Sequence, residues 1–389
     1  MFMEVYLDNS ATTFVNERVI ELMNRTFTEL YGNPSSLHRK GIEAEKLVKD
    51  ARCKLAESLS VSPAEIIFTS GGTESNNLAI KGCARSYMRW GKHLITSKVE
   101  HPSVLNTCKH LEEEGFDVTY LDVDERGIVD VKDFIEAFKK DTILVSVMYI
   151  NNEVGSIQPV QQISRTIASK ERCFFHVDGV QAFGKLLINL KRDGIHMFSL
   201  SGHKINGPKG VGALYIKNGV KLKPLFGGGE QEKGLRSGTE NVSGIAGLGK
   251  AVEVCIENMN AEIEHMRKLK IKLYRGIMAE IPDVKLNGPD PEDSKTSAPH
   301  ILNLSFLGIK GEVLVHCLEE HGIYVSTGSA CSSRKTIQSH VLKAMGLKQD
   351  ELECAIRFSL SPYNKEEEID YTISKLKKVV KELKQIMRR

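Results

Sequence analysis

Short apolar runs alternate with amphipathic stretches between about residue 15 and residue 255 of the chain. Seven runs have the length and the apolar character of buried strands: 66–69, 93–96, 118–121, 143–149, 174–177, 197–200 and 211–216. Helical patterns lie between many of them, as in 102–114, which starts at Pro102 and is followed by Gly115. This alternation predicts an α/β fold with a mostly parallel, seven-stranded sheet covered on both faces.

The pattern changes after about residue 258, where a long charged helix at 260–281 leads into a loop rich in Pro, Asp and Ser. Two strands and two helices follow, at 301–306, 312–320, 356–360 and from Asn364 onward. In the last helix, Glu367 is placed for a capping box. These elements predict a smaller α+β unit.

The chain is long enough for two domains, since its 389 residues exceed the ~250–300 at which one core stops growing. We expect a large α/β domain over residues 14–257. A small α+β domain would combine residues 1–13 with residues 258–389 and carry the segment around Cys331.

The basic end of the last helix, residues 375–389, raises the question of a membrane surface. Its apolar positions form one stripe: Ile369, Ile373, Leu376, Val380, Leu383 and Met387. A stripe of this kind favours docking of the helix on its own domain. The net charge of +3 is too small to indicate nucleic acid or an anionic membrane. The start lacks the pattern of a signal peptide, no apolar run approaches a membrane span, and we expect a cytoplasmic protein.

The eight cysteines include no Cys-x-x-Cys pair, since the closest two, Cys317 and Cys331, are 14 positions apart. A zinc site or a redox disulfide of that type is therefore not predicted. Most of the cysteines have apolar neighbours and are typical of core positions. Cys331 instead lies in a small, polar segment, 326–333, that is typical of a loop with an accessible thiol.

Three further segments lie at the ends of predicted strands, where open α/β sheets bind ligands. The first, 70–77, reads Ser-Gly-Gly-Thr-Glu-Ser-Asn-Asn and opens a helix. Its glycines and free N–H groups suit a phosphate, although a plain strand–helix turn would read the same. The second has Asp178 at the end of an apolar strand. A buried Asp needs a cation there, either a salt-bridge partner or a protonated pyridine nitrogen, and Gln181 could reach a ring oxygen.

The third segment, 201–204, reads Ser-Gly-His-Lys and follows another buried strand. Partial burial would lower the pKa of Lys204 and favour an imine with an aldehyde. Ser201 and His203 flank the lysine and could hold a phosphate, whereas we interpret Lys209 as a surface charge. Together the three segments meet the needs of pyridoxal 5'-phosphate: a phosphate cradle, a pyridinium partner and an imine lysine.

With these segments the chain resembles the cysteine desulfurases of the NifS/IscS type, which are fold-type I, class V aminotransferase-like pyridoxal-phosphate enzymes. The matching segments run nearly from end to end in the family's order and spacing: 6–13, 31–36, 72–77, 100–101, 151–155, 201–204, 235–239, 329–331 and 356–360.

The resemblance implies a role for single residues. Lys204 forms the imine and removes the substrate's α-proton, Asp178 holds the ring nitrogen protonated, Gln181 bonds the ring hydroxyl, and His101 stacks on the ring and moves protons. The phosphate is bound by Gly72, Thr73, Ser201 and His203, with Thr239 supplied by the neighbouring subunit of a homodimer. Asn152 and Arg357 hold the substrate carboxylate, and Cys331 attacks the substrate sulfur.

The implied reaction converts L-cysteine to L-alanine and leaves the sulfur on Cys331 as a persulfide, which then passes to protein acceptors. An iron–sulfur scaffold and a tRNA-thiolation protein are both possible acceptors, and neither nucleic acid nor a membrane is an expected direct partner. No resident metal is predicted, although Cys331 could transiently ligate an iron–sulfur cluster. Selenocysteine lyase is the nearest alternative, and an aminotransferase or a non-catalytic scaffold is more distant.

Some positions keep a second interpretation. Arg357 could form a structural salt bridge, and His101 could serve only at the start of its helix. Gly179 stands where the family usually has Ala, which we expect to loosen the packing slightly. Glu230 intrudes on the family's Gly-Gly-Gly-Gln-Glu pattern and puts the loop before Thr239 in doubt.

Overall fold

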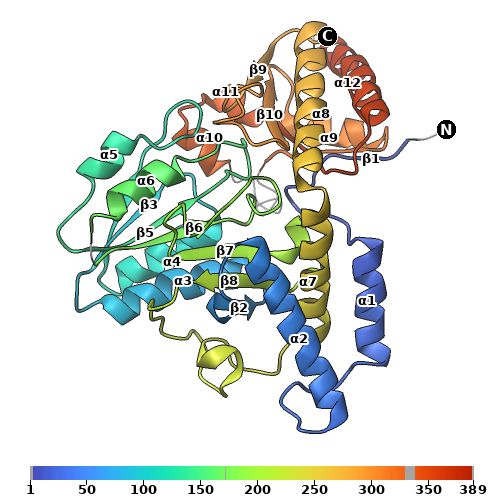
Figure 1. Ribbon diagram of the computed structural model, residues 1–389. Coiled ribbons are helices and arrows are strands. Elements are labelled where there is room, and N and C mark those ends of the chain that lie inside the picture. Colours follow the sequence, from blue (N-terminus) through green and yellow to red (C-terminus); the bar gives the residue numbers. More distant parts are fainter. Residues whose placement is uncertain (1–2, 171, 329–337, 388–389) are drawn as a thin grey trace.

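A seven-stranded sheet organises the first two thirds of the chain in the computed structural model, which describes residues 3–170, 172–328 and 338–387 (Figure 1). The strands lie in the order β2 (Ile66–Thr69), β8 (Gly212–Ile216), β7 (Met197–Ser201), β6 (Phe174–Asp178), β5 (Thr142–Met148), β3 (His93–Ser97) and β4 (Asp117–Leu121). Pairing is parallel from β7 to β4, and β8 is antiparallel to both of its neighbours. The mostly parallel, seven-stranded sheet is thus confirmed.

Successive residues of a strand point to opposite faces, and the sheet therefore has an apolar cluster on each face. On β8, Ala213 and Tyr215 belong to one cluster, and Leu214 and Ile216 belong to the other. The helices of this part are α1 (Glu17–Thr28), α2 (Arg39–Ser58), α3 (Gly72–Tyr87), α4 (Pro102–Glu113), α5 (Val131–Glu136), α6 (Val160–Ile167) and α7 (Val242–Glu257), with short turns η1 (Pro63–Glu65), η2 (Gly202–Lys204) and η3 (Gln231–Gly234). Residues of α3 and α4 fill one cluster, and residues of α2, α6 and α7 fill the other.

A smaller sheet and its helices form the rest of the fold (Figure 1). Strand β10 (Ile301–Phe306) pairs antiparallel with both β12 (Ala355–Ser359) and β9 (Val284–Leu286). Strand β1 (Val5–Tyr6) pairs parallel with β11 (Ile323–Tyr324) in a separate two-stranded sheet, and an isolated bridge between Asp8 and Ser359 links the amino-terminal segment to the end of β12. The helices are α8 (Met259–Glu280), α9 (Gly311–Glu319), α10 (His340–Ala344), α11 (Gln349–Glu353) and α12 (Glu366–Met387). The exact domain boundaries stay a prediction.

The last helix, α12, docks on this smaller unit as expected. Ile369, Ile373, Leu376 and Val380 are buried in one cluster with residues of α8, α9 and β10. The predicted capping box is wrong by one residue. Helix α12 begins at Glu366, so the third residue of the helix is Glu368 and not Glu367. The carboxylate of Glu368 accepts from the backbone N–H of Lys365 at 3.2 Å. Within the described residues, no helix has both the length and the apolar character of a membrane span.

A buried histidine connects three central strands of the large sheet, two residues before Asp178 on the same strand. His176 on β6 is fully buried, with Nδ1 at 2.8 Å from Oγ of Ser146 on β5 and Nε2 at 2.9 Å from Oγ of Ser199 on β7. Burial lowers the pKa of His176 to about 3. The ring is therefore neutral in the folded chain at neutral pH.

This histidine makes the stability of the fold depend on pH. Its pKa is lower in the folded chain than the ~6.5 of the unfolded chain, so its contribution is complete above pH ~6.5 and is lost as the pH falls toward 3. We expect the free energy of unfolding in urea to drop from pH 7 to pH 5 by about 2 kcal/mol more in the wild type than in His176→Gln. His316→Gln, at a side chain that is 78% exposed, is the control and should keep the wild-type drop. Equal drops in His176→Gln and wild type would contradict the assignment.

Candidate active site

A chain of hydrogen bonds connects Asp178 with His101 at the carboxyl edge of the sheet. Asp178 ends β6, and its Oδ2 accepts from Nδ2 of Asn76 on α3 at 2.7 Å. The same amide nitrogen donates to Oγ of Ser103 at 2.9 Å, and that hydroxyl lies 2.8 Å from Nδ1 of His101. Side chains from β6, α3 and α4 therefore form one network.

Asp178 is buried, with 6% of its surface exposed. Its second oxygen, Oδ1, accepts from the backbone N–H of Val180 at 3.0 Å. Among the described residues it forms no ion pair, so the salt-bridge interpretation finds no support in this part of the chain. A buried carboxylate is stabilised by a nearby cation, and the protonated ring nitrogen of pyridoxal phosphate is a group that fits this position.

His101 is the N-cap of α4, as its second interpretation proposed. Its Nδ1 accepts from the backbone N–H of Ser103 at 3.1 Å. Burial lowers the pKa of His101, Asp178 opposes this shift, and the charges of Lys204 and His340 add to it. Because Nδ1 accepts a hydrogen bond, the proton of the neutral ring resides on Nε2. Capping fixes the ring next to Asp178 and leaves that Nε2–H for another partner.

The turn between β2 and α3 forms a cradle without side chains. Gly71 has φ +150°, and α3 begins at Gly72 with no side-chain cap. Its first N–H groups therefore lack helical acceptors. A Cβ built on Gly72 would lie only 2.6 Å from Cγ2 of Val180 and 3.8 Å from Cβ of Ser201. The close approach of α3, β7 and the turn after β6 suits a phosphate at this helix terminus.

The segment that follows β7 is held by the amino-terminal strand segment. Lys204, in η2, donates from Nζ to the carbonyl oxygens of Ser10 and Ala11, the latter at 2.8 Å. Gln181 donates from Nε2 to the same Ser10 oxygen at 3.0 Å, which brings these two predicted residues together. Both side chains also line a small internal pocket.

His203 precedes Lys204 and lies against the same amino-terminal segment, with Nδ1 at 3.2 Å from Oγ1 of Thr12. Burial and the charges of Lys204 and Lys209 lower the pKa of His203 to about 4. A neutral imidazole at this position can donate one N–H to an anion and accept one hydrogen bond. Lys209 itself is exposed, in agreement with its interpretation as a surface charge.

Arg357 on β12 is 2% exposed and is held from three sides. Its Nη2 donates to Oδ1 of Asp8 at 2.7 Å, and its Nη1 donates to the carbonyl oxygens of Asn152 at 2.9 Å and Gly328 at 3.2 Å. The structural salt bridge is thus present. A guanidinium has five N–H donors, and Nε is buried without a partner among the described residues. Donors therefore remain for a carboxylate.

Four predicted residues are not placed in the site by the contacts of their own side chains. Asn152 contributes its backbone oxygen to Arg357, while its side chain forms no hydrogen bond with described residues. Thr73 and Thr239 are exposed, and Thr239 has no described contact with the cradle of its own chain. Cys331 lies outside the described residues.

Residues without a role in the sequence interpretation hold the predicted ones in place. Asn76 and Ser103 link Asp178 to His101, Ser10 receives Lys204 and Gln181, and Asp8 pairs with Arg357. Asn76 lies four positions after Gly72, so it faces the same side of α3. This spacing is the one signal in the sequence that could have found it.

The two departures from the family pattern have different outcomes. A Cβ on Gly179 would lie 1.8 Å from Cζ of Phe198. The expectation of looser packing is therefore wrong, because the Phe198 ring fills the space that an alanine methyl would need. Glu230 is exposed and only its carbonyl oxygen is used, by the N–H of Gly234 at 3.1 Å. The loop is anchored instead by Glu232, which accepts from Arg52 and from the backbone of Phe68.

Comparison with protein families finds one match over nearly the whole chain. The model of the family described as "Aminotransferase class-V" matches residues 5–372. A protein of Clostridium botulinum named "Cysteine desulfurase IscS" is 48% identical over 383 residues, which is 98% of this chain and 96% of that protein. A protein of Bacillus subtilis named "Putative cysteine desulfurase IscS 1" is 45% identical over 380 residues, 97% of this chain and 99% of that one.

Solved structures show the same similarity in three dimensions. One titled "NIFS-LIKE PROTEIN" superposes with a TM-score of 0.91 at 43% identity and covers 97% of this chain and 100% of its own. Another, titled "SspA in complex with cysteine", has a TM-score of 0.81 at 37% identity and covers 93% of this chain and 100% of its own.

Proposed function

The chain belongs to the cysteine desulfurases of the class-V aminotransferase family, and we propose that it takes sulfur from L-cysteine with pyridoxal 5'-phosphate as cofactor. The observation that carries this proposal is Asp178, a buried carboxylate that forms no ion pair among the described residues and whose side chain is held by Asn76. It lies on the same sheet edge as the glycine cradle and Lys204. Few ligands other than a phosphorylated pyridinium aldehyde use all three features.

The residues that would hold the cofactor lie at or near this carboxyl edge of the large sheet. Asp178 would face the ring nitrogen, with Gln181 near the ring hydroxyl and His101 against the ring. The phosphate would be bound by Gly72, Thr73, Ser201 and His203. When bound, the cofactor withdraws electrons from the substrate's α-carbon and makes its proton acidic.

The chain's own residues supply the proton transfers. Lys204 offers an amine whose Nζ can take the α-proton and return a proton, since it sits on a short turn at the sheet edge. The neutral ring of His101 keeps its Nε2–H for the reacting groups because Nδ1 is occupied by Ser103. Both side chains are only partly exposed, which limits exchange of these protons with solvent.

Sulfur transfer is assigned to Cys331. Its thiolate attacks the substrate sulfur, the C–S bond of L-cysteine breaks, and an S–S bond forms on the enzyme. The electron pair of the broken bond stays on the carbon, which is protonated and leaves as L-alanine. The products are one alanine and one persulfide, and the persulfide sulfur then passes to an acceptor thiol.

We extend the proposal to a homodimer in which Thr239 completes the neighbouring phosphate site. Large apolar side chains are exposed in the α1–α2 region and before η3, namely Phe27, Tyr31, Leu37 and Phe226, with Leu37 at 96%. Exposed apolar groups of this size are typical of surfaces that become buried on association. The acceptors are proposed to be proteins of iron–sulfur assembly or tRNA thiolation in the cytoplasm.

The test of the function is a comparison of two substrates. Purified protein is incubated with L-cysteine or L-selenocysteine and a dithiol reductant, and alanine is measured over time. We expect turnover of L-cysteine at a rate at least comparable with that of L-selenocysteine. Turnover of L-selenocysteine alone would support the selenocysteine lyase alternative, and no alanine from either would refute the proposal.

Arg357 provides a separate prediction on substrate binding. Arg357→Lys keeps the charge but loses the planar fork that binds carboxylates. We expect the KM for L-cysteine to rise roughly 10- to 100-fold, the size of a lost charge-assisted hydrogen bond, with a smaller change in kcat. The measurement is steady-state alanine formation over a range of substrate concentrations.

The control separates binding from structure. Asp8→Asn breaks the ion pair but leaves the guanidinium intact, so it should lower the unfolding midpoint and leave KM near the wild-type value. If Asp8→Asn raised KM as much as Arg357→Lys, Arg357 would act through its salt bridge alone.

A further inference from the structure

The loop that precedes Thr239 is fastened to the edge of the large sheet by one buried carboxylate. Glu232 in η3 is 8% exposed, and its Oε2 accepts from the backbone N–H of Phe68 on β2 at 2.8 Å. Strand β2 is the edge strand of its sheet, and Glu232 accepts from this N–H on the side of β2 where no further strand follows. In Figure 1 the loop is the yellow segment beside β2.

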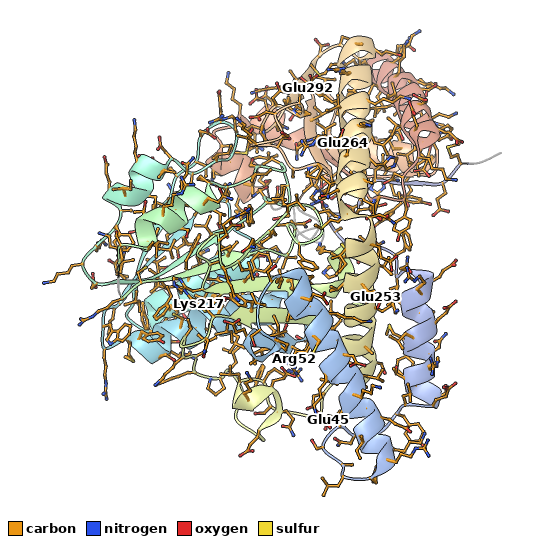
Figure 2. All side chains as sticks on the ribbon, viewed as in Figure 1. Glu45, Arg52, Lys217, Glu253, Glu264 and Glu292 are labelled. Carbon is orange, nitrogen blue, oxygen red and sulfur yellow. The ribbon has the colours of Figure 1, made fainter. Side chains whose placement is uncertain are left out.

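An arginine completes this anchor. Arg52 of α2, labelled in Figure 2, donates to both carboxylate oxygens of Glu232, from Nη2 to Oε1 at 2.6 Å and from Nη1 to Oε2 at 2.9 Å. It also donates to the carbonyl oxygen of Ile66 on β2 at 2.7 Å and stacks on the ring of Phe68 at 4.7 Å. The pair is bidentate and largely buried, the geometry in which such bonds are strongest.

The backbone at the anchor is held in an unfavourable conformation. Glu232 has φ 46° and ψ 42°, Lys233 has φ 59° and ψ 31°, and Gly234 follows at φ 72°. Left-handed backbone at two successive residues with a Cβ persists only where surrounding contacts hold it. The buried contacts of Glu232 do so here, together with a hydrogen bond from Nζ of Lys233 to the carbonyl oxygen of Ala64, and outliers of this kind gather at functional sites.

The anchored turn determines where the loop goes next. Gln231 accepts at Oε1 from the backbone N–H of Gly238 at 3.1 Å, and Ser237 donates from Oγ to the oxygen of Gly229 at 2.8 Å. Arg236 donates from Nε to Glu74, in the first turn of α3, at 3.2 Å. These hydrogen bonds close the loop on itself. Thr239 lies exposed at the end of the loop, and no contact is described between Thr239 and the glycine cradle of its own chain.

We propose that Glu232 is a positioning residue that presents Thr239 to the phosphate site of the neighbouring subunit. This inference rests on the proposed function, which assigns Thr239 to that site. Glu232 itself is buried, and both of its carboxylate oxygens accept hydrogen bonds from its own chain, so it does not touch the cofactor. Its effect therefore has a definite direction: a change at Glu232 in one subunit weakens cofactor retention in the other.

Mixed dimers test this direction. Lys204→Ala removes the imine, so a dimer of one Lys204→Ala subunit and one subunit with Lys204 reports a single site by its visible absorbance. Glu232→Gln is placed either on the subunit with that site or on its Lys204→Ala neighbour. The rate of cofactor loss from the loaded dimer into a scavenger of free aldehyde is then measured. The circular dichroism of each dimer is recorded alongside.

We expect loss to be roughly tenfold faster when Glu232→Gln is on the neighbour, the order of one hydrogen bond to a charged group. On the same subunit it should leave the rate unchanged. Faster loss in the same-subunit arrangement, or no change in either, would overturn the inference. A wild-type chain that forms no dimer or holds no cofactor would refute the proposed function itself and the inference with it.

Two further variants keep the test decisive. Lys233→Gly relieves the left-handed turn and removes the exposed hydrogen bond from Lys233 to the carbonyl oxygen of Ala64, while leaving the buried carboxylate of Glu232 in place, and it should retain the wild-type rate in both arrangements. If Glu232→Gln fails to fold, Arg52→Lys breaks the bidentate pair from the other side and should act across the dimer in the same way. An effect of Arg52→Lys within its own subunit alone would contradict the proposal.

Discussion

Replacing Lys204 with alanine is expected to remove the yellow colour of the purified protein and to lower alanine formation from L-cysteine by a factor on the order of 10³ or more. The amine of Lys204 lies at the sheet edge, where it can both form an imine with an aldehyde and accept a carbon-bound proton. Its loss removes both steps together. The measurements are the visible absorbance after addition of pyridoxal 5'-phosphate and the rate of alanine formation.

Lys209 provides the matched control, since it lies five positions further in the same glycine-rich stretch and is exposed. Lys209→Ala should keep both the absorbance and the rate near those of the wild type. Colour retained in Lys204→Ala and lost in Lys209→Ala would reassign the imine. Adding a small primary amine to Lys204→Ala should restore part of the rate, because a free amine can enter the space of the missing side chain.

The parts of the fold that the sequence predicts are those specified locally. All seven strands of the large sheet are short, mostly apolar runs, and their bounds differ from the expected ones by a few residues at most. Strands β1, β9 and β11 were missed because they are two or three residues long. They exist through pairing with distant segments, as β1 does with β11, and no local pattern carries that information.

The candidate site follows the same division. Asp178 and Lys204 are recognisable because a charged group beside a buried strand is costly without a partner. Asn76 and Asp8 are not, because their partners are far along the chain, and only the fold shows that Asn76 meets Asp178. Glu232 is a similar case. The departure from the family pattern is at the nearby Glu230, which is exposed, and nothing in the sequence indicates that Glu232 is the residue that anchors the loop.

Two pairs of competing interpretations turn out to be compatible. His101 caps α4 and also lies in the network of Asp178, and Arg357 forms a salt bridge and also keeps an unused donor. Buried polar groups need hydrogen-bond partners whatever else they do. A structural contact therefore does not argue against a role in the reaction, and the Arg357→Lys and Asp8→Asn pair is needed to separate the two.

Replacing Cys331 with alanine is expected to stop sulfur transfer in a single turnover with L-cysteine. Without the thiolate, the C–S bond of the substrate has no acceptor for its sulfur. The variant should bind the cofactor and the substrate, since Lys204 and Arg357 are unchanged, and show the absorbance change of substrate binding. It should then form alanine slower by a factor on the order of 10³ or more and carry no added sulfur. Alanine, absorbance and the mass of the intact protein are followed together.

The control for thiol chemistry in general is Cys53→Ala, because Cys53 is an exposed free cysteine far from the site in sequence. It should gain the mass of one sulfur atom as the wild type does. A different outcome would have a clear meaning. If Cys331→Ala formed alanine as fast as the wild type, the substrate sulfur would have to pass to a thiol other than Cys331, because alanine and free sulfide together would require two further electrons. The selenocysteine lyase alternative, which shares every other part of the site, would then become the better account of the chain.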